Sequence, residues 1–143
     1  MNSIEAIIEE TELEENSFNV VYSNAVYEHF PTPSTVTAAI ARVLLPGGVV
    51  FTKTVNWDSY TRDNMGAAWK LLNPGHGHCS LFTSVTLPRF HTNAGLEIVA
   101  LEFSGVRFSE QSLLNTILKG VLSFMSRKTL RGDRIIVIAR KPE

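Results

Sequence analysis

The sequence predicts an α/β fold with a mainly parallel sheet, and three features of one stretch, Ser17 to Gly48, favour this class. Phe18 to Tyr22 is a short apolar run rich in β-branched and aromatic residues, typical of a strand covered on both faces. A helical stripe with i, i+4, i+7 and i+8 spacing follows, formed by Val36, Ile40, Val43 and Leu44. Pro46-Gly47-Gly48 then ends the helix before a second apolar run. Strand, helix and strand at this spacing form one crossover unit of a parallel sheet.

The boundaries of these elements follow from local signals. Ser34 comes directly after a proline and is predicted to cap the first helix. The second strand is predicted over Val49 to Val55, and a polar loop over Asn56 to Asn64. A short helix is predicted next, over Met65 to Leu72 and before Asn73-Pro74-Gly75. Its inward side chains would be Ala67, Ala68, Leu71 and Leu72.

The second half of the chain predicts two helices and two strands. Thr83 is expected to cap a helix over Ser84 to Asn93, in which Pro88 removes one hydrogen bond and either bends this end of the helix or moves its start later. Apolar runs predict strands over Glu97–Phe103 and Arg134–Arg140. Between them, Glu110 to Met125 carries a wide apolar stripe, which predicts a helix that covers the sheet or a dimer contact. At the other end, residues 3–13 suit either a helix or a short strand.

Length and composition place the chain among soluble globular domains. With 143 residues, 44% of them hydrophobic, it is expected to form one domain over 1–143, with an atypical segment at 1–16. A net charge of −1 gives no electrostatic reason to expect nucleic acid or a membrane surface as partner. No apolar stretch is long enough to span a membrane, and the single Cys79 fits a reducing compartment. We therefore expect a cytoplasmic protein.

Several pieces of the chain, in the right order, resemble class I S-adenosylmethionine-dependent methyltransferases. They are S-F-N-V-V-Y-S-N-A-V-Y-E-H-F, A-R-V-L-L-P-G-G, V-N-W-D-S-Y-T-R, L-F-T-S-V-T-L-P-R-F-H-T-N-A-G-L-E-I-V and G-D-R-I-I-V-I-A-R-K-P. The resemblance covers roughly Ile4 to Pro142. It implies a truncated Rossmann-like sheet of about four strands, in which the last strand is antiparallel and inserts between its neighbours, with flanking helices.

The resemblance also implies where a site would lie. Ser23, Asn24 and Ala25 would border the cofactor, and Glu28 and His29 match the acid–histidine pair of the family. On the substrate side it places Asn56, Trp57, Tyr60, His76 and His78. No residue is singled out as catalytic, because methyl transfer in this family depends mostly on positioning the nucleophile against the sulfonium methyl group.

The histidine-rich run from Gly75 to Cys79 also suggests a metal site, since imidazole and thiolate are good zinc ligands. All three ligands fall within four residues, however, and a distant second pair is lacking. We therefore predict no metal here. His78 is better explained as a hydrogen-bonded cap or a substrate contact.

The cofactor half of the family is not recognisable in the sequence. The residues before Phe18 contain no glycine, so they cannot supply the Gly-rich turn that lets the backbone approach the methionine part of the cofactor. The Phe18 strand would then have an unpaired edge, which templates further pairing. We expect a second copy to occupy the edge Phe18–Ser23 in a homodimer, or a separate subunit to carry the cofactor half.

Two functions follow from this sequence-based interpretation. In the first, the protein is a methyltransferase-like module for dimerisation or interaction, without catalysis and without a cofactor. In the second, it is an S-adenosylmethionine-dependent methyltransferase whose site is completed by a second copy or by a cofactor-binding subunit.

Overall fold

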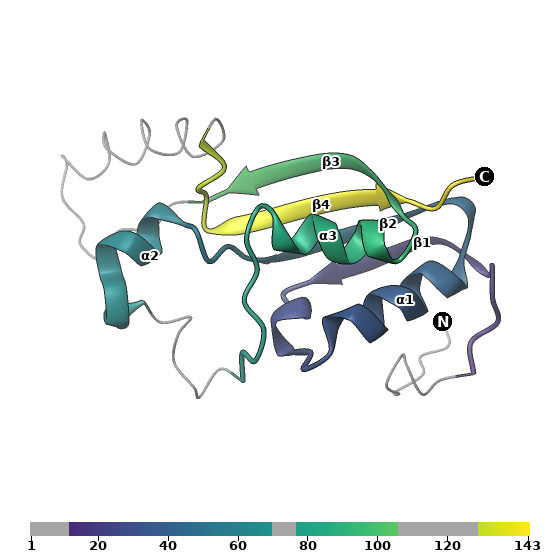
Figure 1. Cartoon of the computed structure of the whole chain (residues 1–143), viewed down its shortest axis with the longest axis horizontal. Helices are drawn as coiled ribbons and strands as arrows, with labels where there is room; N and C mark the ends of the chain where they lie inside the picture. The colour runs from purple at the N-terminus through teal and green to yellow at the C-terminus, as the bar shows by residue number, and fades with distance from the viewer. Residues whose placement is uncertain (1–11, 70–76, 106–128) are drawn as a thin grey trace.

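A four-stranded mixed sheet lies at the centre of the computed structural model, which describes residues 12–69, 77–105 and 129–143. The strands are β1 (Phe18–Asn24), β2 (Leu44–Val55), β3 (Glu97–Ser104) and β4 (Arg134–Arg140), and their order is β1-β2-β4-β3. β1 and β2 are parallel, whereas β4 runs antiparallel to both of its neighbours (Figure 1). The predicted Rossmann-like sheet, with one antiparallel strand inserted between two others, is confirmed.

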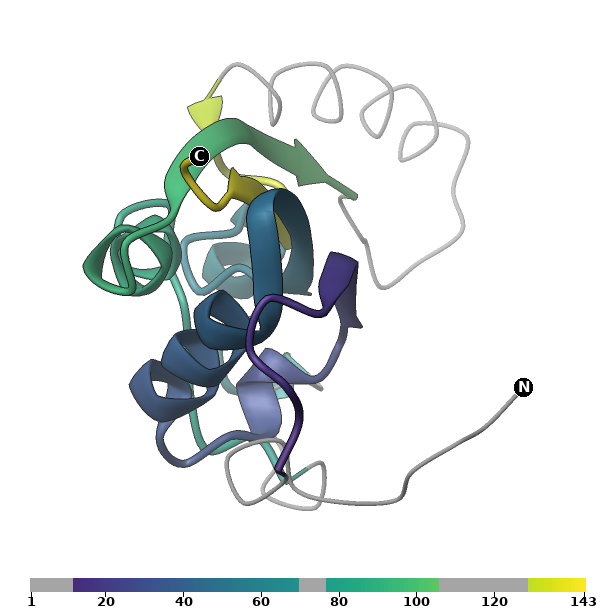
Figure 2. The same ribbon diagram turned by 90° about the vertical axis from the view of Figure 1, so that its right-hand side faces the viewer.

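Two helices cover one face of this sheet. α1 (Pro33–Val43) and α3 (Thr86–Asn93) lie side by side on it, as Figure 2 shows. From Gly48 onward every second residue of β2 is buried, as is every second residue of β4; Val50 and Val137 are examples. The core is completed by the predicted helix stripe and by aromatic side chains, and its members are Tyr27, Val36, Ile40, Leu44, Val50, Phe82, Leu87, Leu96, Phe103, Ile135, Val137 and Ala139.

The start of α1 differs from the prediction. The helix begins at Pro33, and the residue before it, Thr32, makes no capping bond through its side chain. Proline suits the first helical position because its missing N–H has no partner there and its φ is already helical. The prediction that Ser34 caps the helix is therefore wrong, since Ser34 lies inside the first turn.

α1 ends at Val43, and the Pro-Gly-Gly sequence lies inside β2, so the prediction that this sequence separates the helix from the second strand is wrong. β2 begins at Leu44 rather than Val49, and its register with β1 shifts between the pairs Phe18–Leu44 and Val20–Val49. A Cβ atom on Gly48 would lie 2.8 Å from the carbonyl oxygen of Leu45 and 3.1 Å from that of Phe18. Only glycine allows the two strands to approach this closely at the irregularity.

The segment after β2 contains more helix than predicted at its start and less at its end. α2 (Tyr60–Met65) occupies part of the predicted loop, and the Ser59 hydroxyl caps it by accepting a bond from the backbone N–H of Arg62 at 3.1 Å. The predicted helix over 65–72 is, in its described part, only the 3₁₀ turn η2 (Gly66–Ala68). Ala67 and Ala68 are exposed there, so the prediction that they point inward is wrong.

α3 begins two residues later than predicted, at Thr86. The Thr83 hydroxyl accepts bonds from the backbone N–H groups of Val85 and Thr86, so it organises the turn that leads into the helix. Pro88 now falls within the first turn, where no intrahelical bond is lost. The alternative in which the proline moves the helix start later is confirmed.

Some predictions fall outside the described residues: the helix or strand over 3–13 up to residue 11, the helix over 110–125, and His76. In the part of the chain that the structure describes, no helix combines the length and the apolar character needed to cross a membrane.

Candidate functional site

The candidate site lies at the carboxyl end of β1. The strand ends at Asn24, and Ala25 takes a left-handed conformation (φ 55°) while its N–H bonds the carbonyl of Lys53 at 2.8 Å. The 3₁₀ turn η1 (Tyr27–His29) follows at once. Sites in α/β proteins lie beyond the carboxyl ends of parallel strands, so this turn occupies the expected position.

The residues expected to border a cofactor lie at this strand end in two different environments. Ser23 is buried, and its hydroxyl has no hydrogen-bond partner among the described residues. Asn24 and Ala25 are exposed. A buried hydroxyl without a partner is costly, so Ser23 is suited to accept or donate a bond to a bound polar group.

Glu28 is the most unusual residue of η1 because its side chain is only 1% exposed. The Thr54 hydroxyl donates to Oε2 of Glu28 at 2.5 Å, and no described Lys or Arg forms an ion pair with this carboxylate. Buried carboxylates are normally paired with a cation or coordinate a metal. Thr54 was not predicted as part of the site, although it lies on the predicted strand.

A strap of residues 77–80 crosses η1 and brings His78 to this group. The N–H groups of Cys79 and Ser80 both donate to the carbonyl of Glu28, at 2.9 and 3.1 Å. Nδ1 of His29 lies 3.2 Å from the carbonyl oxygen of Gly77. The rings of His29 and His78 pack edge to face, with 4.8 Å between the ring centres. Three of the predicted substrate-side residues are thus brought together, from two segments about fifty residues apart.

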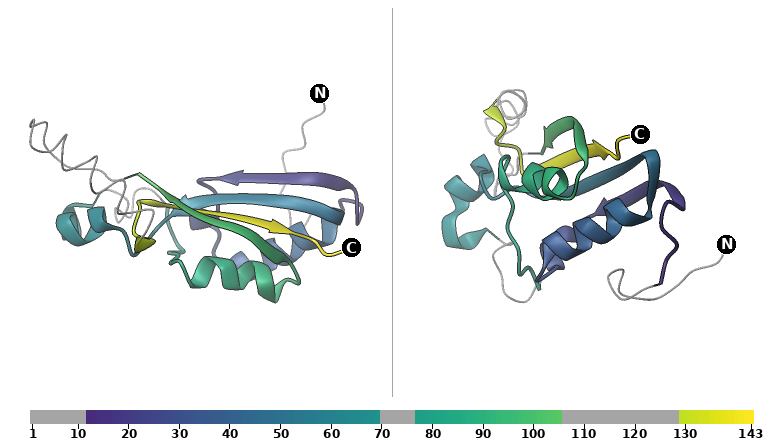
Figure 3. Two further views of the ribbon diagram at one scale, coloured as in Figure 1. Left: turned by 90° about the horizontal axis from the view of Figure 1, so that it is seen from above. Right: turned by 45° about the vertical axis from the view of Figure 1, so that its right-hand side comes forward.

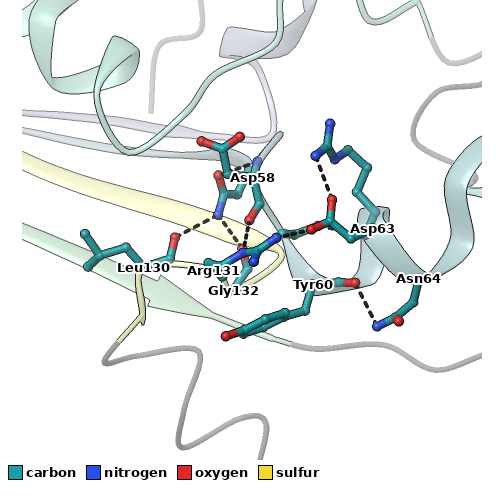
Figure 4. A network of polar contacts seen from close by, with 10 residues as sticks. Asp58, Tyr60, Asp63, Asn64, Leu130, Arg131 and Gly132 are labelled. Carbon is teal, nitrogen blue, oxygen red and sulfur yellow. Dashed lines mark hydrogen bonds and ion pairs between the residues drawn. The ribbon is translucent and has the colours of Figure 1, made fainter.

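A second group lies around α2 and contains the three remaining described residues of the predicted substrate side, Asn56, Trp57 and Tyr60. Asn56 is buried, and its amide donates to the carbonyls of Gly132 and Leu130, at 2.7 and 3.2 Å (Figure 4). Arginine side chains cover the two aromatic rings: Arg62 lies 4.5 Å from the centre of Trp57, and Arg131 lies 4.5 Å from that of Tyr60.

Asp63 joins the two arginines of this second group. It forms ion pairs with both Arg62 and Arg131 (Figure 4). The hydrogen bond from Arg62, together with the charge of Arg131, lowers the pKa of Asp63 below its usual value. These contacts fasten α2 to the chain just before β4. These contacts cannot be predicted from local sequence patterns, because Arg131 lies 68 residues beyond Asp63.

Sequence reasoning also missed His91, which lies under the site in the core. It is fully buried and stacks on Tyr27, with ring centres 5.8 Å apart. Its Nδ1 bonds the carbonyl of Leu87 at 3.0 Å, and its Nε2 lies 3.0 Å from the Thr52 hydroxyl. Since a carbonyl only accepts, Nδ1 carries the proton and Thr52 donates to Nε2. Burial lowers the pKa of His91 and raises that of Tyr27.

The sheet order and the position of the site define the class, a Rossmann-like methyltransferase fold, and comparison with known proteins agrees. Residues 3–101 match the model of a methyltransferase domain. The chain belongs to this methyltransferase family.

One curated relative is the ubiquinone biosynthesis O-methyltransferase of Thiobacillus denitrificans, which is 40% identical over 85 residues. The match covers 56% of this chain and 37% of that enzyme. The chain thus matches only about two fifths of the length of such relatives.

Solved structures share the fold at low sequence identity. An S-adenosylmethionine-dependent methyltransferase from Archaeoglobus fulgidus superposes with a TM-score of 0.66 at 15% identity, covering 96% of this chain and 66% of that one. A chain from the complex of the Haloferax volcanii Trm112 methyltransferase activator with a methyltransferase gives 0.65 at 13% identity, covering 96% and 60%.

Proposed function

We propose that the protein forms the substrate-side part of an S-adenosylmethionine-dependent O-methyltransferase. The observation that carries the proposal is the juxtaposition, at the carboxyl end of β1, of a buried Ser23 hydroxyl without a partner and the group Glu28, His29 and His78. The O-methyltransferase names of relatives such as the Thiobacillus enzyme support this function over a non-catalytic interaction module.

In this proposal the chain's own residues divide between cofactor and acceptor. Ser23 and Asn24 would hold the cofactor, which supplies the methyl group when bound. Glu28, His29 and His78 would face the acceptor hydroxyl, whose oxygen forms the new bond to the methyl carbon as the carbon–sulfur bond breaks. The sulfonium becomes a neutral thioether, and the hydroxyl proton passes to solvent. The rate gain would come mainly from holding the two reactants in line.

We further propose that polypeptide beyond these 143 residues supplies the cofactor half and pairs with the outer edge of β1. No described strand pairs with that edge. A separate subunit is one source, and the Haloferax structure is an example of a methyltransferase fold in complex with an activator protein. In the absence of such a subunit, a second copy of the chain would cover the edge as a homodimer. The single cysteine supports a reducing compartment, the cytoplasm, as its location.

A chimeric enzyme tests the proposed function. The 85-residue stretch of this chain that matches the Thiobacillus enzyme would replace its counterpart in that enzyme. We expect the chimera to bind S-adenosylhomocysteine with micromolar affinity in a calorimetric titration and to methylate the acceptor of the parent enzyme. A chimera that melts like the parent and binds the product nucleoside, yet transfers no methyl group, would contradict the proposal.

Two asparagines of β1 provide a matched pair for the cofactor contact. Asn24→Ala should weaken S-adenosylhomocysteine binding by the chimera roughly tenfold, the value of one good polar contact. Asn19→Ala is the control, because Asn19 is equally exposed but lies near the other end of the same strand. Equal affinities of the two variants would remove Asn24 from the cofactor site.

A further inference from the structure

We infer that Glu28, His29 and His78 form a binding site for a divalent transition-metal ion. One ligand atom from each of these residues lies within 4.8 Å of the others. Two imidazoles and one carboxylate are the ligand set of catalytic zinc sites and of related sites for iron or cobalt. This inference goes beyond the proposed function, because metal binding requires neither the methyl donor nor the acceptor.

The sequence argued against a metal site because the histidines and the cysteine lacked a distant second pair of ligands. The fold supplies such a pair. In the sequence, His76, His78 and Cys79 stand close together, without a distant second pair of ligands. In the structure, η1 provides that pair, Glu28 and His29, and the strap of residues 77–80 is fixed to it by backbone bonds at Glu28. The ligands therefore come from two segments held in one geometry, which is the usual arrangement of a metal site in a folded domain.

Neighbouring groups already orient two of the three ligands. Nδ1 of His29 must donate its proton to the Gly77 carbonyl, so the lone pair required by a metal is on Nε2. The Thr54 hydroxyl holds the Glu28 carboxylate in one orientation through Oε2. Bonds of this kind from non-ligating groups are a regular feature of metal sites, where they fix the tautomer and the ring direction.

The buried charge of Glu28 gives an independent reason for a cation. Its side chain is 1% exposed and pairs with no described Lys or Arg. A bound dication would neutralise this charge. His29 is exposed and His78 is half-buried, so the ion could enter from solvent, and a position not taken by protein would remain open to an oxygen ligand.

Nitrogen ligands select the class of ion. Zn²⁺ and Co²⁺ accept imidazole readily, whereas Mg²⁺ prefers octahedral oxygen ligands. In a tetrahedral site, with metal–ligand bonds of about 2.0–2.1 Å, neighbouring ligand atoms stand roughly 3.3 Å apart. Metal binding therefore requires the side chains of His29 and His78, which are more exposed than Glu28, to move closer to its carboxylate. We therefore expect Zn²⁺ to bind and Mg²⁺ not to compete.

Titration of the full chain tests the inference without any methyltransferase assay. The chain, freed of affinity tag and treated with chelator, is titrated with Zn²⁺ by calorimetry and with Co²⁺ by visible absorption. We expect one ion per chain, micromolar or tighter affinity for Zn²⁺, and d–d bands of a cobalt site with nitrogen ligands. Absence of saturable binding at millimolar Zn²⁺, or equal binding of Mg²⁺, would overturn the inference.

Variants at the exposed ligands identify the site. His29→Ala and His78→Ala should each weaken Zn²⁺ binding roughly tenfold or more. Cys79→Ser is the matched control, because Cys79 adjoins His78 in the strap but is not one of the three ligands. Unchanged affinity in both histidine variants, or an equal loss in Cys79→Ser, would overturn the assignment. Far-ultraviolet dichroism and melting temperature verify that each variant is folded.

Discussion

His91 shows how much one buried polar side chain depends on its partners. Its ring lies in the core against Tyr27, and both ring nitrogens are occupied, Nδ1 by the Leu87 carbonyl and Nε2 by the Thr52 hydroxyl. The neutral ring satisfies this arrangement. Protonation would place a charge in the core, away from water, which is why burial lowers the pKa of His91.

A pH dependence of stability follows from the lowered pKa. Below the ordinary histidine pKa of about 6.5, the unfolded chain binds a proton at His91 that the folded chain does not. The free energy of unfolding should therefore fall as the pH decreases below that value, until the lowered pKa of the folded state is reached. Urea unfolding between neutral and mildly acidic pH measures this fall.

His91→Phe is the control for this prediction, because phenylalanine keeps the contact with Tyr27 but cannot be protonated. Because the substitution also changes the free energy of unfolding at neutral pH, the quantity to compare is the slope of that free energy against pH. We expect a flatter pH profile for the variant over the range in which the wild type loses stability. Identical slopes would assign the pH dependence to other groups.

Which residues belong to the site could be predicted from the sequence more easily than the contacts that surround each of them. The acid–histidine pair and His78 were recognised, but their approach requires the strap over η1, which no spacing in the sequence reveals. His91 lies four residues after Leu87, on the buried side of α3. The helical pattern of the sequence does not reveal His91, because that pattern is defined by apolar side chains.

At the scale of elements, Asn56 fixes the end of β2 to the chain before β4. Its amide donates to two carbonyls of that segment, and its oxygen accepts from the N–H of Asp58 at 3.1 Å. Asn56→Ala should lower the free energy of unfolding by about 1–3 kcal/mol, because buried carbonyls would lose their partner. Asn64→Ala is the control: Asn64 is exposed and bonds only the Tyr60 carbonyl within α2, so its loss should be within about 0.5 kcal/mol. Equal effects in urea unfolding would contradict this role of Asn56.

The two glycines of the β2 irregularity give a second prediction. Gly48→Ala should destabilise the protein by about 2–3 kcal/mol, because its Cβ would press on backbone oxygens of β1 and of Leu45. Gly47→Ala should cost less, about 1 kcal/mol, because Gly47 has a positive φ of 75° but open space around it. Thermal unfolding of both variants measures the difference, and a larger loss for Gly47→Ala would contradict it.

Helices and strands could be predicted from the sequence where the residues buried by packing are also those of the apolar pattern. The strands and α1 carry strong apolar patterns, and the resemblance supplied their order. α2 was missed because its six residues carry no apolar stripe; it depends on the Ser59 cap and on Arg131, which stacks on Tyr60 from a distant segment. Helices held by such remote contacts leave little trace in local sequence.

At the scale of the whole molecule, β1 is the strand whose outer edge we expect another polypeptide to cover. It forms one end of the described sheet, as the left view of Figure 3 shows. Three of its apolar side chains are exposed: Phe18 by 41%, Val20 by 63% and Tyr22 by 67%. Long apolar edges template further pairing, and natural proteins cover or charge them. β1 carries no charged residue.

The mass of the purified chain in solution tests this account most directly. If, as proposed, a second copy covers β1 when no other partner is present, light scattering should give about twice the 15.9 kDa of one chain. Val20→Lys places a charge on the exposed edge and should shift the mass toward that of one chain. A wild-type protein that remains a 15.9 kDa monomer at every concentration would contradict the proposal that a second copy covers β1 in the absence of another partner.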